Sequence, residues 1–275
     1  MPEAVLPEFD RPPVAEVVLS VKFNPTGLTV GHVGLLWQEY RRTFPNIEEH
    51  APLDVPVEIL KERRPALAPP KIEVVQVPRT RTWFVSEAGD QLVQVQHDFF
   101  AHNWRRAAAA PSYPRYAAIR NEFEAELKEF VAFLEKQELG TPVPVQCEVS
   151  YVNHITMDGD LRGHEDLHDV FRLWAAPSFE FLPKIDDGRF LARFVIPGTK
   201  GEFLGRLHLS VQPGFIGEGP EERQVFVATL TARGVPTSDS VSGILEFLDK
   251  GHEWIVRGFA DCTTPRMHMV WGRTK

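Results

Sequence analysis

Apolar and polar residues alternate in many short stretches of this chain, as they do in strands that bury one face. In the first stretch, Val14–Phe23, Val17 and Leu19 share one face and Glu16 and Ser20 share the other. The same pattern predicts strands over residues 72–77, 82–86, 92–100, 143–154, 179–185, 189–196, 203–211 and 224–232. A proline-rich loop over 51–70 is expected to include a short edge strand at 55–60.

Other stretches place apolar residues at helical spacing. Helices are predicted over 33–44, from about Pro114 to 139, within 163–174 and over 241–259. Ser238, Asp239 or Ser240 is the expected cap of the last long helix, and a final turn starts at Thr264.

The order of these elements predicts an α+β fold made of two like halves. Each half reads β-α-β(3-4)-α, over residues 14–139 and 140–275, after an N-terminal tail of residues 1–13. The two halves are expected to form one compact unit with a wide antiparallel sheet and helices on one face. This order is similar to the saddle of the TATA-binding-protein class, although no residue motif repeats between the halves.

The stretch 91–106, QLVQVQHDFFAHNWRR, contains the first group of candidate binding residues. It reads as a strand with one apolar and one polar face, followed by a corner that places an indole beside two guanidinium groups. Such a corner suits a flat or anionic partner. The candidates are Gln94, Gln96, Asp98, Asn103, Trp104 and Arg105. The structural alternative is a solvated sheet face followed by a turn.

A second group lies on the strands of the other half. Tyr151 and Asn153 could present donors and acceptors to a ligand, although Asn153 could equally bind backbone at a strand end. Arg206 and His208 fall on the polar face of their strand and could share a surface with the glutamines of the first half. His252 lies on an apolar helix stripe, which favours a core histidine.

The segment HEDLH at 164–168 matches the spacing of a zinc-binding helix. His164 and His168 would be the metal ligands and Glu165 the general base of a metal-dependent hydrolase. Phe171 stands where the longer motif has glycine, and no residue marks a third ligand. A solvated helix face is the simpler interpretation, and no cofactor is predicted.

Composition narrows the class of partner. The chain of 275 residues carries a net charge of −8, which argues against a dedicated nucleic-acid surface. A nucleic-acid-binding saddle using Arg105, Arg106 and Arg115 stays as an alternative. The sequence shows neither a leader pattern nor an apolar run of bilayer length, so we expect a cytoplasmic protein that does not bind membranes. Cys147 and Cys262 are expected to be buried thiols.

Four segments resemble one uncharacterised, sporadically distributed bacterial family of similar length. They are PPVAEVVLSVKF, LVQVQHDFFAHNWRR followed by YPRY, CEVSYVNHI, and HEWIVRGFADCTTPRMHMVWGR. The likeness covers nearly the whole chain. It implies a full-length bacterial protein with an accessory or defence-associated role. Since the family has no established activity or cofactor, it assigns no role to any residue.

Taken together, the sequence predicts a non-catalytic binding or interaction protein. The polar sheet face, or the groove between the halves, would hold another protein or a small polar ligand. Because this face is expected to be solvent-exposed, substitutions at Gln94, Gln96 and Arg206 should cost less than about 0.5 kcal/mol of stability. The sequence predicts no oligomeric state.

Overall fold

The computed structural model describes residues 5–58, 80–107, 112–157, 161, 163–175, 180–183, 185–198, 201–217 and 219–275. In these residues, nine strands form one antiparallel sheet in the order β2-β3-β4-β5-β1-β6-β9-β8-β7. The strands are β1 (Val14–Phe23), β2 (Asn46–His50), β3 (Arg81–Val85), β4 (Gln91–Gln96), β5 (Phe99–Arg105), β6 (Pro144–Thr156), β7 (Phe190–Pro197), β8 (Phe203–Ile216) and β9 (Arg223–Gly234).

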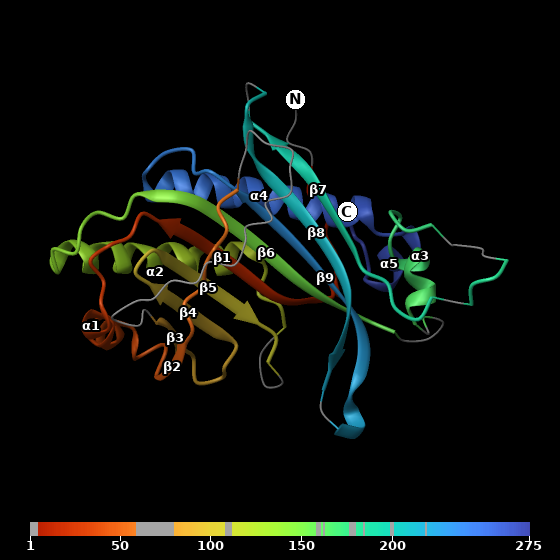
Figure 1. Cartoon of the computed structure of the whole chain (residues 1–275), viewed down its shortest axis with the longest axis horizontal. Coiled ribbons are helices and arrows are strands. Elements are labelled where there is room, and N and C mark those ends of the chain that lie inside the picture. The colour runs from red at the N-terminus through yellow and green to blue at the C-terminus, as the bar shows by residue number, and fades with distance from the viewer. Residues whose placement is uncertain are drawn as a thin grey trace.

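The described helices are α1 (Val30–Tyr40), α2 (Tyr116–Lys136), α3 (Leu167–Val170), α4 (Val241–Cys262) and α5 (Pro265–Val270), with 3-10 turns η1 (His164–Asp166) and η2 (Gly219–Glu221). The long ones cover one face of the sheet. Figure 1 shows the two long helices, α2 and α4, behind the sheet, where α2 packs on β5 and α4 packs on β6 and β9. The expected α+β class with an antiparallel sheet is confirmed.

The core lies between the sheet and the two long helices. Val17, Leu19 and Val21 of β1 are fully buried there, as their alternation predicts. Helix α4 approaches the sheet closely at Gly251, where a Cβ atom would lie 3.1 Å from the side chain of Ala232. The face of the sheet that packs against α2 and α4 is named the helix-covered face below, and the opposite one is named the polar face.

Most boundaries agree with the sequence pattern. Strand β1 covers the predicted range, and α4 begins directly after Ser240, whose hydroxyl accepts a hydrogen bond from the amide of Gly243 at 3.1 Å. The last helix, α5, starts at Pro265, and Thr264, where a final turn was predicted, is its N-cap. None of the described helices has an apolar stretch long enough to cross a bilayer.

The prediction of one strand over residues 92–100 is wrong, because the chain reverses there. His97 and Asp98 form a two-residue turn between β4 and β5. No glycine marks this turn. Its carbonyl groups instead accept hydrogen bonds from the amides of Phe23 and Thr26, both at 2.8 Å. A turn stabilised by residues so distant in sequence leaves no local signal.

Two other strand predictions need correction, and a third is not tested. Residues 180–183 and 185 form no strand, so the strand predicted over 179–185 is wrong for these residues. Residues 55–58 form no edge strand either, and 72–77 lie outside the described residues. Strand β2 was not predicted, because its sequence NIEEH has a single large apolar residue and sits at the sheet edge.

Candidate functional site

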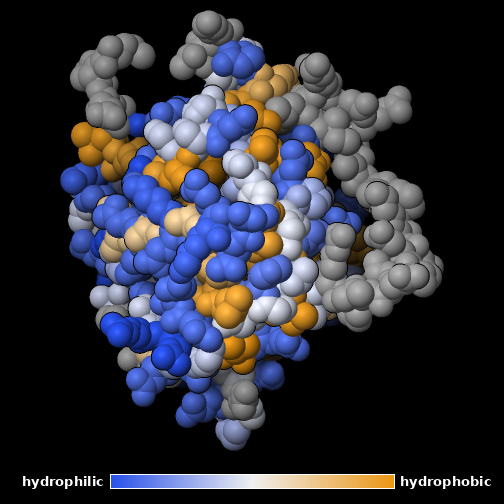
Figure 2. Space-filling model, turned by 90° about the vertical axis from the view of Figure 1, so that its left-hand side faces the viewer, coloured by the Kyte–Doolittle hydropathy of each residue, from blue (hydrophilic) through white to orange (hydrophobic). Residues whose placement is uncertain are grey.

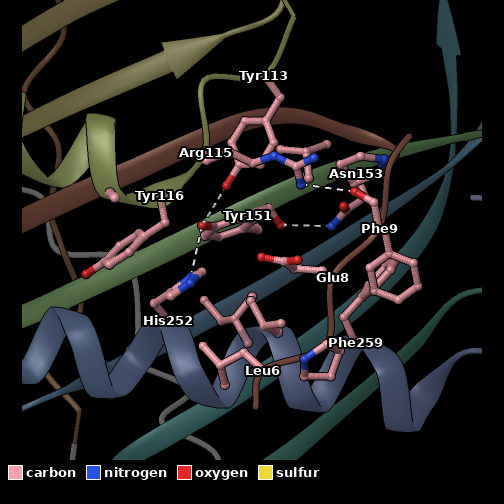
Figure 3. A pocket seen from close by; sticks show the side chains of 16 residues that line it. Leu6, Glu8, Phe9, Tyr113, Arg115, Tyr116, Tyr151, Asn153, His252 and Phe259 are labelled. Carbon is pink, nitrogen blue, oxygen red and sulfur yellow. Dashed lines mark hydrogen bonds between the residues drawn. The ribbon is translucent and has the colours of Figure 1, made fainter. Parts of the chain in front are cut away.

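A cavity of about 500 Å³ lies on the helix-covered side of the sheet (Figure 3). Its walls are the start of α2, the middle of α4, part of β6 and residues 6–12, here named the N-terminal segment. Most lining side chains are apolar, and the polar ones are Glu8, Tyr113, Arg115, Tyr116, Tyr151, Asn153 and His252. A mostly apolar cavity of this size with a few converging polar groups is typical of a small-molecule site.

Three polar groups from three separate elements form a hydrogen-bonded relay in this cavity. The hydroxyl of Tyr151 on β6 lies 3.0 Å from the hydroxyl of Tyr113, which precedes α2. The same Tyr151 hydroxyl lies 3.0 Å from Nδ1 of His252 on α4. Through Tyr151, the relay therefore connects strand β6 to the segment before α2 and to helix α4 (Figure 3).

All three groups of the relay are uncharged at neutral pH. Burial raises the pKa of Tyr151, and it raises the pKa of Tyr113 to about 12. Burial also lowers the pKa of the His252 imidazole to about 4, although nearby acidic residues oppose this change. The cavity thus presents neutral donors and acceptors.

Tyr116 fixes the orientation of the His252 ring. The two rings stack with their centroids 3.9 Å apart and an angle of 6° between their planes. The Tyr116 hydroxyl donates a hydrogen bond of 2.8 Å to Asp249, and the Arg120 guanidinium binds the same carboxylate at 2.9 Å. The imidazole is therefore held by α2 as well as by its own helix.

The N-terminal segment closes one side of the cavity instead of forming a loose tail. Phe9 is only 6% exposed, and its ring packs edge-on against Phe259 at a centroid distance of 5.8 Å. The amide of Asp10 donates a hydrogen bond of 3.0 Å to the carbonyl of Gly272. Residues near the two ends of the described chain therefore lie side by side at this site.

Arg115 connects this segment to the start of α2. Its Nη1 donates a hydrogen bond of 3.0 Å to the carbonyl of Phe9. Its backbone φ angle is 74°, a left-handed conformation that costs a non-glycine residue energy and often occurs at binding sites. The strain is maintained by contacts of the residue with the N-terminal segment.

Tyr151 and Asn153, which the sequence predicted as a ligand-binding pair, both line the cavity. The Asn153 amide nitrogen donates a hydrogen bond of 3.0 Å to the carbonyl of Ala228. Within the described residues, the side-chain oxygen of Asn153 accepts no hydrogen bond from the protein. It is thus an acceptor available to a ligand.

Most other predicted residues lie on the opposite, polar face of the sheet. These are Gln94, Gln96, Asn103, Arg105, Arg206 and His208, while Asp98 sits in the turn after β4 and Trp104 is buried on the helix-covered face. The strand registers place the glutamines of one half and Arg206 of the other on one face, as predicted. The expected solvent exposure is wrong, because Gln94 and Arg206 are each 6% exposed.

Residues 51–58, here named the strap, cross the polar face and cover part of it. Both backbone polar groups of Leu53 bind the Gln96 amide, at 2.9 and 3.1 Å. At the other end, Glu58 pairs with Arg206 and, at 2.9 Å, with His208. Burial raises the pKa of Glu58, but hydrogen bonds from His208 and Arg206 outweigh it and lower the pKa to about 2.

The three arginines of the nucleic-acid alternative each bind a backbone carbonyl of the protein itself. Arg105 donates to Gly89 at 2.6 Å, Arg106 to Val14 at 2.9 Å, and Arg115 to Phe9. These contacts give each guanidinium a structural role in the chain.

The HEDLH segment forms η1 and the start of α3, but the side chain of His164 lies outside the described residues. Nδ1 of His168 lies 3.0 Å from the carbonyl oxygen of Glu165. No group of three metal-ligating side chains occurs among the residues that the structure describes. The zinc hypothesis therefore gains no support from the described geometry.

No protein-family model, curated protein or solved structure matches this chain. The resemblance of its motifs to a bacterial family accordingly stays a prediction.

The sequence did not identify Tyr113, Tyr116 or His252 as site residues. The only signals were two tyrosines three apart at the start of a helix and one histidine on an apolar stripe. Each pattern is more common in a protein core than in a binding site. Only the packing of α2 against α4 brings the three side chains together.

Proposed function

We propose that this chain is a non-catalytic binding protein that holds a small, mostly apolar molecule with a hydroxyl group in the cavity of Figure 3. The observation that carries the proposal is the neutral relay of Tyr113, Tyr151 and His252 in a cavity of about 500 Å³ whose other lining residues are mostly apolar. The apolar walls would bury the body of the ligand, and the relay would orient its polar group.

The pKa values of the relay favour binding over catalysis. General acid–base catalysis is most efficient when the pKa of the catalytic group lies near the working pH. Burial lowers the pKa of His252 to about 4 and raises the pKa of Tyr113 to about 12. Both groups are thus poor proton carriers at neutral pH but remain good hydrogen-bonding partners.

A hydroxyl is the group that matches the relay best. If Tyr151 donates to a neutral His252, Tyr113 donates to Tyr151 and keeps its oxygen as an acceptor. If both hydrogen bonds reverse, the Tyr113 hydroxyl becomes a free donor. A ligand hydroxyl can pair with either state. It donates to Tyr113 in the first state, and in the second it accepts from Tyr113 and can donate to the side-chain oxygen of Asn153.

Calorimetric titration with three matched probes tests this proposal. The probes are 2-naphthol, naphthalene and 2-naphthoate, which share a ring system and differ in their polar group. We expect 2-naphthol to bind about fivefold more tightly than naphthalene, because one additional hydrogen bond contributes roughly 1 kcal/mol. We expect 2-naphthoate to bind more weakly than 2-naphthol, since its charge would be buried.

Tyr113→Phe is the informative variant, and Tyr40→Phe is its matched control. Tyr40 donates its hydroxyl to the carbonyl of Glu126 at 2.6 Å, away from the cavity. Tyr113→Phe should remove the preference for 2-naphthol, and Tyr40→Phe should preserve it. Equal affinities for 2-naphthol and naphthalene in the unmodified protein would refute the proposed ligand class.

We also propose that residues 14–139 and 140–275 are two like halves arranged as a saddle. Strand order supports this proposal, since β5, β4 and β3 follow outward from β1 as β9, β8 and β7 follow outward from β6. In each half a helical segment follows the first strand and a long helix follows the last. Strand β2 and the shortness of α3 are the differences between them. Folding of residues 140–275 expressed alone would test it.

A further inference from the structure

The strap crosses the polar face from one half of the sheet to the other. It binds Gln96 of β4 at Leu53, Gln146 of β6 at Pro56, and Arg206 of β8 at Glu58. It makes these contacts without pairing as a strand. The polar face therefore already holds an extended segment of polypeptide in this structure.

Two glutamine side chains recognise the strap through its backbone. The Gln96 amide accepts from the nitrogen and donates to the oxygen of Leu53, at 2.9 and 3.1 Å. The Gln146 amide donates to the carbonyl of Pro56 at 3.1 Å and accepts from the amide of Glu58 at 2.7 Å. Contacts of this kind do not depend on the side chains of the bound segment.

Two side chains of the strap supply the sequence-dependent contacts. Val55 is 8% exposed and packs against Phe99 and Ala101 on the polar face. Three residues later, the Glu58 carboxylate meets Arg206 and, at 2.9 Å, His208. In this structure the face therefore holds an apolar residue followed at the third position by a carboxylate.

The strap buries little apolar surface of its own. Val55 is its one buried residue, the side chain of Glu58 is 8% exposed, and the other residues of the strap are exposed. A segment with so little buried apolar surface opens locally at a low free-energy cost. The groups beneath it still require partners, because Gln96 and Gln146 are only 4% and 3% exposed.

We propose that the polar face is a docking surface for an extended peptide segment of a partner protein, in which a carboxylate lies three residues after an apolar residue. The strap is a built-in occupant with the same chemistry, and the partner segment replaces it. This site lies on the side of the sheet opposite the cavity and does not depend on the cavity having a ligand.

A peptide with the sequence of the strap, APLDVPVE with blocked ends, is the direct probe. The strap competes with it intramolecularly, at an effective concentration of roughly millimolar. Glu58→Ala weakens that competitor and leaves Arg206 and His208 for the peptide carboxylate. By fluorescence anisotropy, we expect the peptide to bind Glu58→Ala at least about tenfold more tightly than the unmodified protein.

Two controls test whether the peptide occupies the proposed position. A peptide ending in Gln in place of Glu should lose about tenfold in affinity for the Glu58→Ala protein. Glu148→Ala removes a different carboxylate of the polar face, which binds Arg233 at 2.5 Å, and should leave binding as weak as in the unmodified protein.

The variant Glu58→Gln, which preserves side-chain shape, takes the place of Glu58→Ala if the alanine variant does not fold. Binding that is absent from the folded variant would overturn the proposal and make the strap a structural element only. Equal affinities of the Glu and Gln peptides for the variant would overturn it as well. Neither result would affect the expected binding of 2-naphthol in the cavity.

Discussion

The two faces of the sheet bury polar side chains in different ways. On one face, long helices cover the sheet and the polar groups of the cavity bind one another, as in the Tyr113–Tyr151–His252 relay. On the other face, the strap covers part of the sheet and supplies partners for some of its polar groups, as Glu58 does for Arg206. A strap can lift away locally, whereas a packed helix cannot.

This difference has an energetic consequence. Loss of one partner from a buried charged pair leaves the other charge unsolvated. Beneath the helices no local movement relieves that cost. Beneath the strap, opening exposes the remaining charge to water and limits the cost. The variants below compare the two faces, from the largest expected effect to the smallest.

His102→Ala should have the largest effect. His102 is fully buried beneath α2, with Nδ1 2.7 Å from a carboxylate oxygen of Glu126. Burial lowers the pKa of His102, but the Glu126 carboxylate outweighs it, and the net change is upward. Without the imidazole this carboxylate, whose side chain is 12% exposed, loses its charged partner beneath α2. We expect urea denaturation to show a loss of about 3 kcal/mol in the free energy of unfolding.

Addition of Glu126→Gln to His102→Ala is the control for this prediction. The amide carries no charge to bury, so the double variant should be more stable than His102→Ala alone. A loss below about 1 kcal/mol in the single variant would contradict the expectation that an unpaired charge beneath the helices stays poorly solvated.

A decrease in pH should destabilise the helix-covered side through His252. The folded-state pKa of about 4 lies below the ordinary value of 6.5, so the unfolded chain binds the proton first. Stability should fall as pH drops from about 6.5 to about 4, by on the order of 2 kcal/mol. Urea midpoints across that range provide the measurement. In His252→Gln this part of the pH dependence should disappear, and an unchanged slope would contradict it.

Arg206→Ala tests the strap-covered side. Arg206 is 6% exposed and pairs with Glu58. Because the strap can lift and expose Glu58 to water, we expect a loss of only about 1–2 kcal/mol. Hydrogen exchange should become faster at the strap amides of Leu53 and Glu58. A loss as large as that of His102→Ala, with no faster exchange, would remove the distinction between the faces.

Tyr151→Phe should have the smallest effect. It removes the central hydroxyl of the relay, but water can enter the adjoining cavity and replace the two lost partners. We expect the free energy of unfolding to fall by about 1 kcal/mol, as for one hydrogen bond, in thermal or urea denaturation. Tyr40→Phe, whose hydroxyl binds the Glu126 carbonyl at 2.6 Å, is the matched comparison. A loss above about 3 kcal/mol would indicate that water does not reach the relay.

Local periodicity was sufficient for most of the fold. The alternation in Val14–Phe23 and the apolar stripe from Val241 onward depend on neighbours within a few residues, and both elements occur where the pattern predicted them. The turn at His97 and Asp98 was missed, because amides of Phe23 and Thr26 stabilise it from another part of the chain. A pattern of neighbours contains no information about such contacts.

The sequence by itself determined which residues share a face of each strand, since side chains alternate along any strand. It therefore paired Gln94 with Gln96, Arg206 with His208, and Tyr151 with Asn153. Only the tertiary structure decided that the first two pairs share one face of the sheet, that the strap binds Gln96, Arg206 and His208, and that α2 and α4 surround Tyr151 and Asn153 with a cavity. Burial and cavity shape depend on contacts between residues far apart in the chain, and no local pattern specifies them.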